Sequence, residues 1–118
     1  MENISILTSV KKMLGLSEDY NVFDLDVIIH INSAFSVLTQ LGVGPSEGYS
    51  ISDASNTWDE FLPPTDPLSS KLDLVKTYVY LKTRIAFDPP TSSIVVEAMN
   101  KTISEYEWRI NAIVDPGK

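Results

Sequence analysis

The sequence predicts a mainly α-helical fold, a small bundle of about four helices. Apolar residues recur with helical spacing in four separate stretches, and no such period runs through the long punctuated segment 42–67. The last two stretches, about 68–87 and 92–113, are joined by a short turn at Asp88-Pro89-Pro90, so we expect a long antiparallel helical hairpin. With 118 residues, the chain has room for one domain, 1–118.

The first expected helix lies near the start of the chain. Its apolar residues fall at spacings of three, three and four: Ile4, Leu7, Val10 and Leu14. Asn3 can cap the entry, and Gly15 can end the helix.

The second expected helix contains a longer apolar stripe. Its residues repeat at spacings of four, three, four and three: Val27, Ile31, Ala34, Leu38 and Leu41. Asp24 and Asp26 lie in the first turn, where the free N–H groups and the helix dipole favour carboxylates. The helix is expected to end at Gly42.

The segment 42–67 is expected to be a long loop, because glycine and proline interrupt it throughout. Tyr49 and Ile51 alternate with serines, which indicates a short β element, and residues 57–62 can form one helical turn. The apolar side chains of this loop either fold onto the body or are offered to a partner, and the sequence leaves both options open. They are Tyr49, Ile51, Trp58, Phe61 and Leu62.

The two arms of the hairpin differ in their apolar surface. The first has two adjacent rows, Leu68-Leu72-Val75-Val79 and Leu74-Tyr78-Leu81-Ile85, which is typical of a central helix. The second has one stripe, formed by Val96, Met99, Ile103, Tyr106, Ile110 and Ile113. The opposite side of that arm bears Glu97, Lys101, Glu105 and Arg109, which we interpret as a solvated face. Thr91, Ser92 or Ser93 can cap this second arm.

The net charge of −7 is unevenly distributed. Residues 13–70 contain nine carboxylates and neither lysine nor arginine. Such a surface repels a phosphate backbone, so specific DNA binding by this region is disfavoured. An acidic wall around a DNA passage stays compatible with the pattern, and so does a simple role in solubility.

Composition also limits the possible chemistry. Cysteine is absent, which excludes disulfides, thiolate metal sites and a cysteine nucleophile. The start of the chain lacks the pattern of a signal peptide, and no apolar run approaches the roughly 20 residues that span a bilayer. We therefore expect a soluble, unsecreted protein that does not insert into a membrane.

Candidate catalytic and metal-binding residues are few. His30 is the single histidine, and Asp26 lies one helical turn before it, a spacing that can place two ligands on a metal. A third ligand is not evident, so we favour a surface pair or part of an interface. No catalytic triad can be built, and the Gly42-Val43-Gly44-Pro45 segment lacks the features of a phosphate-binding loop. We expect no catalytic site, metal or cofactor.

Five segments carry a resemblance to a known family: DVIIHINSAF (26–35), QLGVGP (40–45), TWDEFL (57–62), VKTYVYLK (75–82) and FDPP (87–90). Together they resemble the head-tail connector proteins of tailed bacteriophages and prophages. The likeness extends from the second helix to Trp108-Arg109, and it is one of packing and turn residues rather than of a catalytic signature.

The resemblance implies a non-enzymatic virion structural protein, a connector or adaptor subunit that forms a ring, typically of twelve copies, beneath the portal protein. Such a ring extends the DNA channel, lets DNA pass without specific binding, and binds the tail or a stopper (head-completion) protein. It also implies a location at the head-tail interface of the virion, and in the host cytoplasm during assembly. The C-terminal segment, roughly 108–118, would dock against the portal, and the middle loop would serve neighbouring subunits.

Seven residues are candidates for protein interfaces on this basis: Tyr49, Ile51, Trp58, Phe61, Trp108, Arg109 and Ile113. Trp108 could equally be a core residue, because it lies beside the apolar stripe of the second arm. The alternative function is a small helical adaptor or regulatory module that binds a protein partner through the loop 49–62.

Overall fold

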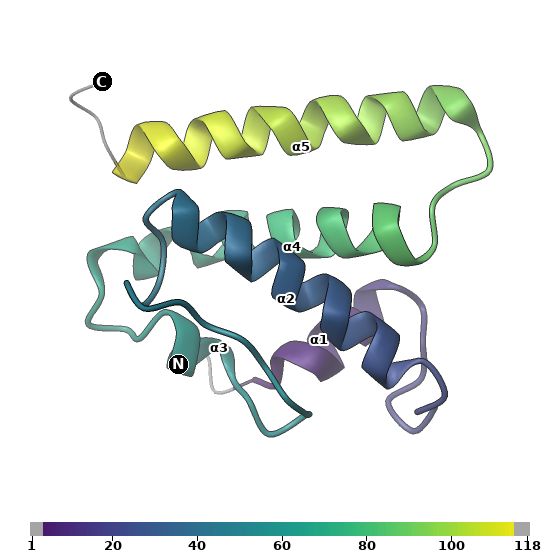
Figure 1. Ribbon diagram of the computed structural model, residues 1–118, viewed down its shortest axis with the longest axis horizontal. Coiled ribbons are helices and arrows are strands. Elements are labelled where there is room, and N and C mark those ends of the chain that lie inside the picture. Colours follow the sequence, from purple (N-terminus) through teal and green to yellow (C-terminus); the bar gives the residue numbers. More distant parts are fainter. Residues whose placement is uncertain (1–3, 115–118) are drawn as a thin grey trace.

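The computed structural model describes residues 4–114 and is mainly helical, as the sequence predicts (Figure 1). Its elements, in chain order, are α1 (Ile6–Met13), α2 (Asp24–Gln40), α3 (Trp58–Phe61), the 3₁₀ turn η1 (Pro67–Lys71), α4 (Leu72–Phe87) and α5 (Ser93–Val114). Each helix within the described residues is too short or too polar to span a membrane.

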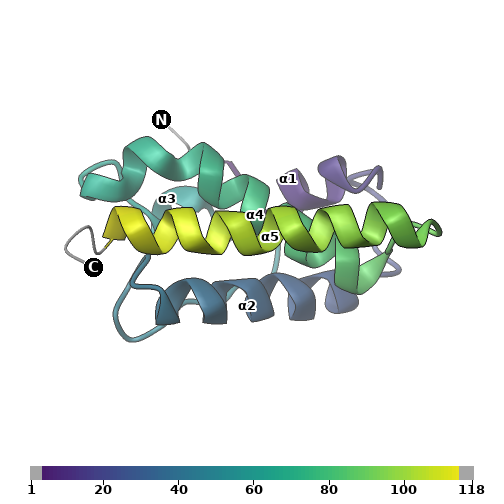
Figure 2. The same ribbon diagram turned by 90° about the horizontal axis from the view of Figure 1, so that it is seen from above.

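Helix α4 is the central helix, as its two apolar rows predict. It contacts α1, α2 and α5. Helices α2 and α4 form one layer, and α5 lies over this layer, antiparallel to α4 (Figures 1 and 2). The predicted helical hairpin is therefore confirmed, and the second arm packs on one side only.

The core fills the space between α2 and α4. The predicted stripe of α2 is confirmed, because Val27, Ile31, Ala34 and Leu38 are fully buried. On α4, the residues that face this stripe are also buried: Leu72, Val75, Tyr78 and Val79. Burial of such side chains stabilises the fold by about 1.5–3 kcal/mol each relative to exposure.

Helix α1 begins later than the sequence suggests. Ser5 precedes its first residue, and the Ser5 Oγ accepts a hydrogen bond of 3.1 Å from the Thr8 N–H, so Ser5 is the cap. Asn3, the expected cap, lies outside the described residues.

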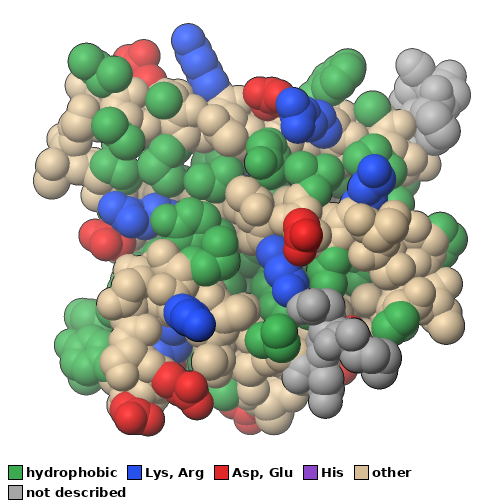
Figure 3. Space-filling model, turned by 180° about the vertical axis from the view of Figure 1, so that it is seen from behind, with side chains coloured by type: hydrophobic (Ala, Val, Ile, Leu, Met, Phe, Trp, Pro, Cys, Tyr) green, Lys and Arg blue, Asp and Glu red, His purple; other side chains and the backbone are tan. Residues whose placement is uncertain are grey.

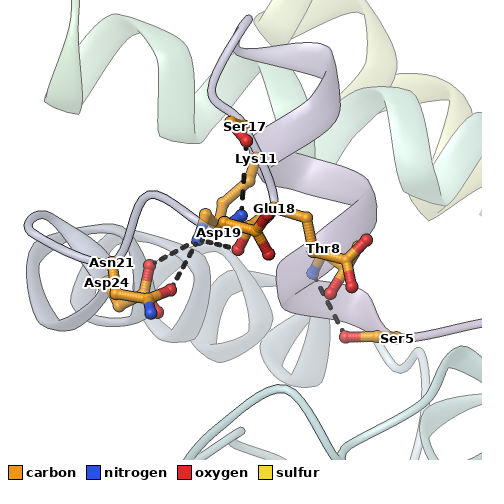
Figure 4. A network of polar contacts seen from close by, with 8 residues as sticks. All are labelled: Ser5, Thr8, Lys11, Ser17, Glu18, Asp19, Asn21 and Asp24. Carbon is orange, nitrogen blue, oxygen red and sulfur yellow. Dashed lines mark hydrogen bonds and ion pairs between the residues drawn. The ribbon is translucent and has the colours of Figure 1, made fainter.

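A buried lysine joins α1 to the start of α2 (Figure 4). Lys11 is only 2% exposed, and its Nζ lies 2.8 Å from Oδ1 of Asp24. The same Nζ donates to the Glu18 carbonyl at 3.1 Å and to Oδ1 of Asn21 at 3.3 Å. A buried charge requires this degree of pairing. Asp24 therefore holds α1 in place, in addition to favouring the start of α2.

The loop 42–67 follows the prediction in one part and not in another. The predicted helical turn at 57–62 forms as α3. The expected β element at Tyr49–Ser52 was wrong: no strand occurs within residues 4–114, and one isolated bridge joins Ser5 to Thr57 instead. The backbone of Ile51 is paired by a side chain, because its N–H donates to Oδ1 of Asn32 at 2.8 Å and its carbonyl accepts from Nδ2 at 3.0 Å.

The hairpin has the expected ends, with one refinement. Its first arm starts as the 3₁₀ turn η1, where Asp66 Oδ1 accepts from the Leu68 N–H at 2.8 Å, and becomes α-helical at Leu72. The arm ends at Phe87, and Asp88 leaves the helical region with a φ of −146°. Of the three possible caps for α5, Ser92 accepts a long hydrogen bond of 3.4 Å from the Val95 N–H.

Candidate interaction surfaces

The apolar side chains of the middle loop fold onto the body. Trp58 is 1% exposed, and its Nε1 donates to Oγ of Ser9 at 3.0 Å. Ile51 and Phe61 are also buried, and the Phe61 ring lies 4.5 Å from the ring of Phe35 between centroids. Of the two options left open by the sequence, the structure therefore shows the first. An interface role for these three residues stays a prediction, and it would require them to leave the core.

Tyr49 sits at the edge of this cluster and is half-buried. Its ring meets the ring of Phe35 edge-on at 5.2 Å, and its hydroxyl donates to Oε1 of Glu60 at 3.0 Å. Burial raises the pKa of Tyr49 well above its usual range, and the Glu60 carboxylate raises it further. Both the ring and the hydroxyl of Tyr49 thus contact residues of the same chain.

The outer face of α5 carries the accessible members of the predicted interface set. Trp108 is 71% exposed, and Arg109 is exposed beside it. The Arg109 Nη2 lies 2.6 Å from Oε2 of Glu105, and its guanidinium lies 6.0 Å from the Tyr106 ring. Ile113 is partly buried at the seam between α5 and η1. The sequence left the location of Trp108 open, and the structure places it in solvent.

The predicted solvated face of α5 is confirmed, but it is not purely polar. Its four charged residues are exposed, as expected: Glu97, Lys101, Glu105 and Arg109. Ile94, which is 79% exposed, shares this side of the helix with Trp108. Large apolar residues therefore lie near both ends of the outer face of α5.

A second apolar row on α2 and the residues just before it escaped the sequence reasoning. Val22, Leu25 and Ile29 are 72%, 75% and 60% exposed, and they recur at spacings of three and four. The signal was present in the sequence, because these residues recur at helical spacing on the side of α2 opposite the buried row. An exposed row of this kind is typical of a surface that contacts another protein.

An open hollow of about 650 Å³ lies between the start of α2 and the end of α4. Aromatic rings form much of its lining: the Phe87 ring lies 5.5 Å from that of Phe23 and 6.5 Å from that of His30. Its complete lining is Leu16, Phe23, Asp26, His30, Ala86, Phe87 and Asp88. Its two sides lie about 60 positions apart in the sequence, so no local pattern indicates it.

The candidate pair Asp26 and His30 lines this hollow on successive turns of α2, and Asp88 lies on the opposite side. Within residues 4–114, no group of three His, Asp or Glu side chains is arranged to hold a metal ion. Asp26 is exposed and His30 is partly buried, and a role for either in an interface stays a prediction.

Basic side chains are confined to particular elements. Within the described residues, every lysine and arginine belongs to α1, η1, α4 or α5. Figure 3 shows the face opposite to the view of Figure 1, where hydrophobic side chains form a band with both cationic and acidic side chains beside them. Helix α2, by contrast, has carboxylates and no cation. Cations are therefore absent from α2, whereas α4 and α5 carry both cations and carboxylates.

A family model described as phage connector protein matches residues 6–117, which is nearly the whole chain. The chain belongs to the phage connector family. No curated protein and no solved structure matches it significantly. Membership confirms the resemblance to connectors, and it makes the chain a phage structural protein that works with other phage structural proteins.

The family match extends to residue 117 and so includes the end of α5. Residues 108–114 form the end of α5, whereas 115–118 lie outside the described residues. In the described part, Trp108 and Arg109 are exposed and Ile113 is partly buried. The connector thus has accessible side chains at this end of α5.

Proposed function

We propose that this connector is a head-tail connector subunit, which forms a ring beneath the portal, extends the DNA channel and joins the capsid to the tail. The observation that carries the proposal is the family match over residues 6–117. A ring of twelve, as the resemblance implies, is the expected number of copies. The protein would act by binding and positioning other proteins rather than by catalysis.

Exposed apolar side chains support a role in assembly. They occur on two separate helices, in the row Val22, Leu25 and Ile29 near α2 and at Ile94 and Trp108 on α5. Single exposed apolar residues are common on monomeric proteins, whereas rows of them mark contacts with other proteins. A ring subunit needs contacts on two sides, because each copy has two neighbours.

The charge distribution supports passage of DNA without binding. Residues 13–70 contribute nine carboxylates and no cation. If this part of each subunit faces the channel, the wall repels the phosphate backbone and DNA can slide. Salt should then have little effect on DNA retention, because counterion release requires cationic contacts.

The loop 42–67 would meet its neighbours through its tip rather than through its aromatic residues. Residues 52–55 are exposed, whereas Ile51, Trp58 and Phe61 are buried. We propose that this tip faces the next subunit or the tail, and that the end of α5 faces the portal. The alternative function, an adaptor that binds through 49–62, depends on the buried residues, so no observation favours it.

Light scattering after size exclusion, with and without the portal protein of the same phage, tests the proposal. We expect a multimer, either of the chain alone or bound to the portal. A monomer at high concentration that also ignores the portal would overturn the head-tail connector assignment. The same measurement on the complex gives the number of copies.

A further inference from the structure

We infer that the hollow between α2 and α4 receives Trp108 of a second copy of this chain, in a head-to-tail contact. The inference rests on the proposed ring and assigns the two surfaces that meet in it. Four properties of the described residues support it: the lining of the hollow, the exposure of Trp108, the charges around both, and their positions in the fold.

The hollow is suited to an aromatic side chain. Its rings belong to Phe23, His30 and Phe87, and aromatic rings pair favourably edge-on or offset. The hollow is open to solvent, and its volume of about 650 Å³ leaves room for a large side chain. The exposed row near the start of α2 belongs to the same stretch of chain as Phe23 and His30, which line the hollow. A side chain inserted here would meet these aromatic rings together with the carboxylates of Asp26 and Asp88.

Trp108 is the side chain of this chain best suited to fill it. It is 71% exposed, whereas the other tryptophan, Trp58, is 1% exposed and belongs to the core. Tryptophan is enriched among the residues that dominate interface energies, because it buries a large area with few rotatable bonds. Its position on the outer face of a straight helix makes it accessible to a second molecule.

Arg109 offers one cation to the acidic hollow, and Glu105 and Glu107 flank Trp108 as well. Asp26 and Asp88 line the hollow, and no lysine or arginine does so within the described residues. Arg109 follows Trp108, and its side chain is 53% exposed. Its pair with Glu105 is a surface pair, which contributes little and can be exchanged. A contact of the hollow with another hollow would instead bring carboxylates together, so a symmetric pair is disfavoured.

The positions of the two surfaces lead to repeated assembly. The hollow lies where α2 begins and α4 ends, and Trp108 lies in the C-terminal third of α5, toward the other end of the longest axis (Figures 1 and 2). When Trp108 of one copy enters the hollow of the next, each molecule keeps one free hollow and one free tryptophan. Such heterologous contacts continue until the rotation closes them into a ring.

The first test compares two exposed apolar residues of α5. Trp108→Ala should raise the dissociation constant for self-association at least about thirtyfold, which is the loss expected for a dominant interface residue. Ile94→Ala is the matched control, because Ile94 is equally exposed and lies about 21 Å away along the same helix. The control should assemble like the unchanged chain. Light scattering over a range of concentrations measures both, and circular dichroism verifies that both variants fold.

The second test exchanges charges across the contact. Asp26→Arg and Arg109→Glu should each weaken self-association, because each leaves two like charges facing one another. The two changes combined in one chain should restore it. Restoration cannot result from a general loss of folding, so it separates a contact from a structural effect.

The third test uses the absence of cysteine from the chain. Glu105→Cys places a thiol one turn from Trp108, and Ala86→Cys places one at the hollow, at exposed positions in both cases. A short thiol cross-linker should join the two variants when they are mixed, and neither variant to itself. Cross-linking of one variant to itself would overturn the head-to-tail contact.

The remaining outcomes separate the inference from the proposed function. If the chain forms rings, and Trp108→Ala and Asp26→Arg form them equally well, the inference is wrong and the connector assignment stands. If Trp108→Ala forms rings but no longer binds the portal protein, Trp108 contacts the portal, and the second copy is the wrong occupant. If the unchanged chain neither self-associates nor binds the portal, the ring proposal falls and the inference falls with it.

Discussion

Helix α5 and the segment 42–67 use apolar residues in opposite ways. Helix α5 has 22 residues in a regular helix, yet Ile103 and Ile110 are its two fully buried residues. The segment 42–67 has little regular structure and contributes five side chains that are at most 3% exposed: Val43, Ile51, Trp58, Phe61 and Leu62. The irregular region therefore fills more of the core than the longest helix does.

This difference shows that regular helical structure and extensive burial are separate properties, although an apolar stripe at helical spacing suggests both. Periodicity requires only that one side of a helix be apolar, and α5 meets that requirement by packing along one line on α4. An irregular segment can be buried when its backbone finds partners, as that of Ile51 does in the Asn32 side chain. We therefore expect stability to depend on the loop, and assembly on the outer face of α5.

The two tryptophans give the largest test of this comparison. Trp58→Ala should lower the free energy of unfolding by about 3–5 kcal/mol, because it removes a buried ring and leaves a cavity. Trp108→Ala should change the free energy of unfolding by less than about 0.5 kcal/mol, because removal of an exposed ring creates no cavity. Urea unfolding of both variants measures the difference. Equal losses of unfolding free energy in the two variants would show that α5 and the loop contribute equally to stability.

A pair of glycines tests how tightly the loop is packed. Gly44 has a φ of +83°, and a Cβ there would collide with the ring of Phe61. Gly44→Ala should therefore destabilise the protein by about 2–4 kcal/mol, from backbone strain together with overpacking. Gly48→Ala is the matched control, since its φ is also positive but nothing lies near its Cβ position. Thermal unfolding should show a loss of only about 1–2 kcal/mol for the control.

The hydrogen bonds between Asn32 and Ile51 give the next largest effect. Asn32→Ala removes both partners of the Ile51 backbone and should destabilise the protein by about 2–3 kcal/mol, because a partly buried N–H and carbonyl lose their bonds. Asn100→Ala on the exposed surface of α5 is the control, and we expect a change within about 0.5 kcal/mol. Hydrogen exchange of the Ile51 amide should become much faster in Asn32→Ala and stay unchanged in Asn100→Ala.

Regular elements of this fold could be predicted closely from sequence, because their apolar stripes are continuous. The second arm of the hairpin was expected at 92–113 and occurs at Ser93–Val114. In the loop 42–67, such local patterns no longer predict the secondary structure. Alternation at 49–52 correctly separates buried Ile51 from exposed serines, but an extended chain becomes a strand only if another strand pairs with it. Here the partner is a side chain from α2, which no local pattern reveals.

The candidate surfaces were predictable in part. Trp108 and Arg109 were named from sequence, and their exposure agrees with an interface role that is still to be tested. The hollow could not be predicted, because Phe23 and Phe87 meet only through the packing of α2 against α4. The location of Lys11 could not be predicted either. Its charge suggests the surface, whereas the fold buries it beside Asp24.

The smallest expected effect concerns how α5 is held on α4. The Tyr78 hydroxyl donates to Oε2 of Glu107 at 2.7 Å, which links the two helices. Burial raises the pKa of Tyr78 well above its usual range, and the hydrogen bond and the charge of Glu107 raise it further. Removing the bond by Tyr78→Phe should cost about 1–2 kcal/mol at pH 7.

The stability loss of Tyr78→Phe should also depend on pH. Above pH about 10 the unfolded chain releases the Tyr78 proton while the folded chain retains it, so the folded state binds more protons and its stability falls as pH rises. Tyr78→Phe lacks this contribution, so its disadvantage relative to the unchanged chain should shrink by up to about 1.4 kcal/mol per pH unit above pH 10. Urea unfolding at pH 7, 10 and 11 measures the convergence. Parallel losses at all three pH values would mean that the hydroxyl does not link α4 to α5, and that apolar packing alone holds the outer helix.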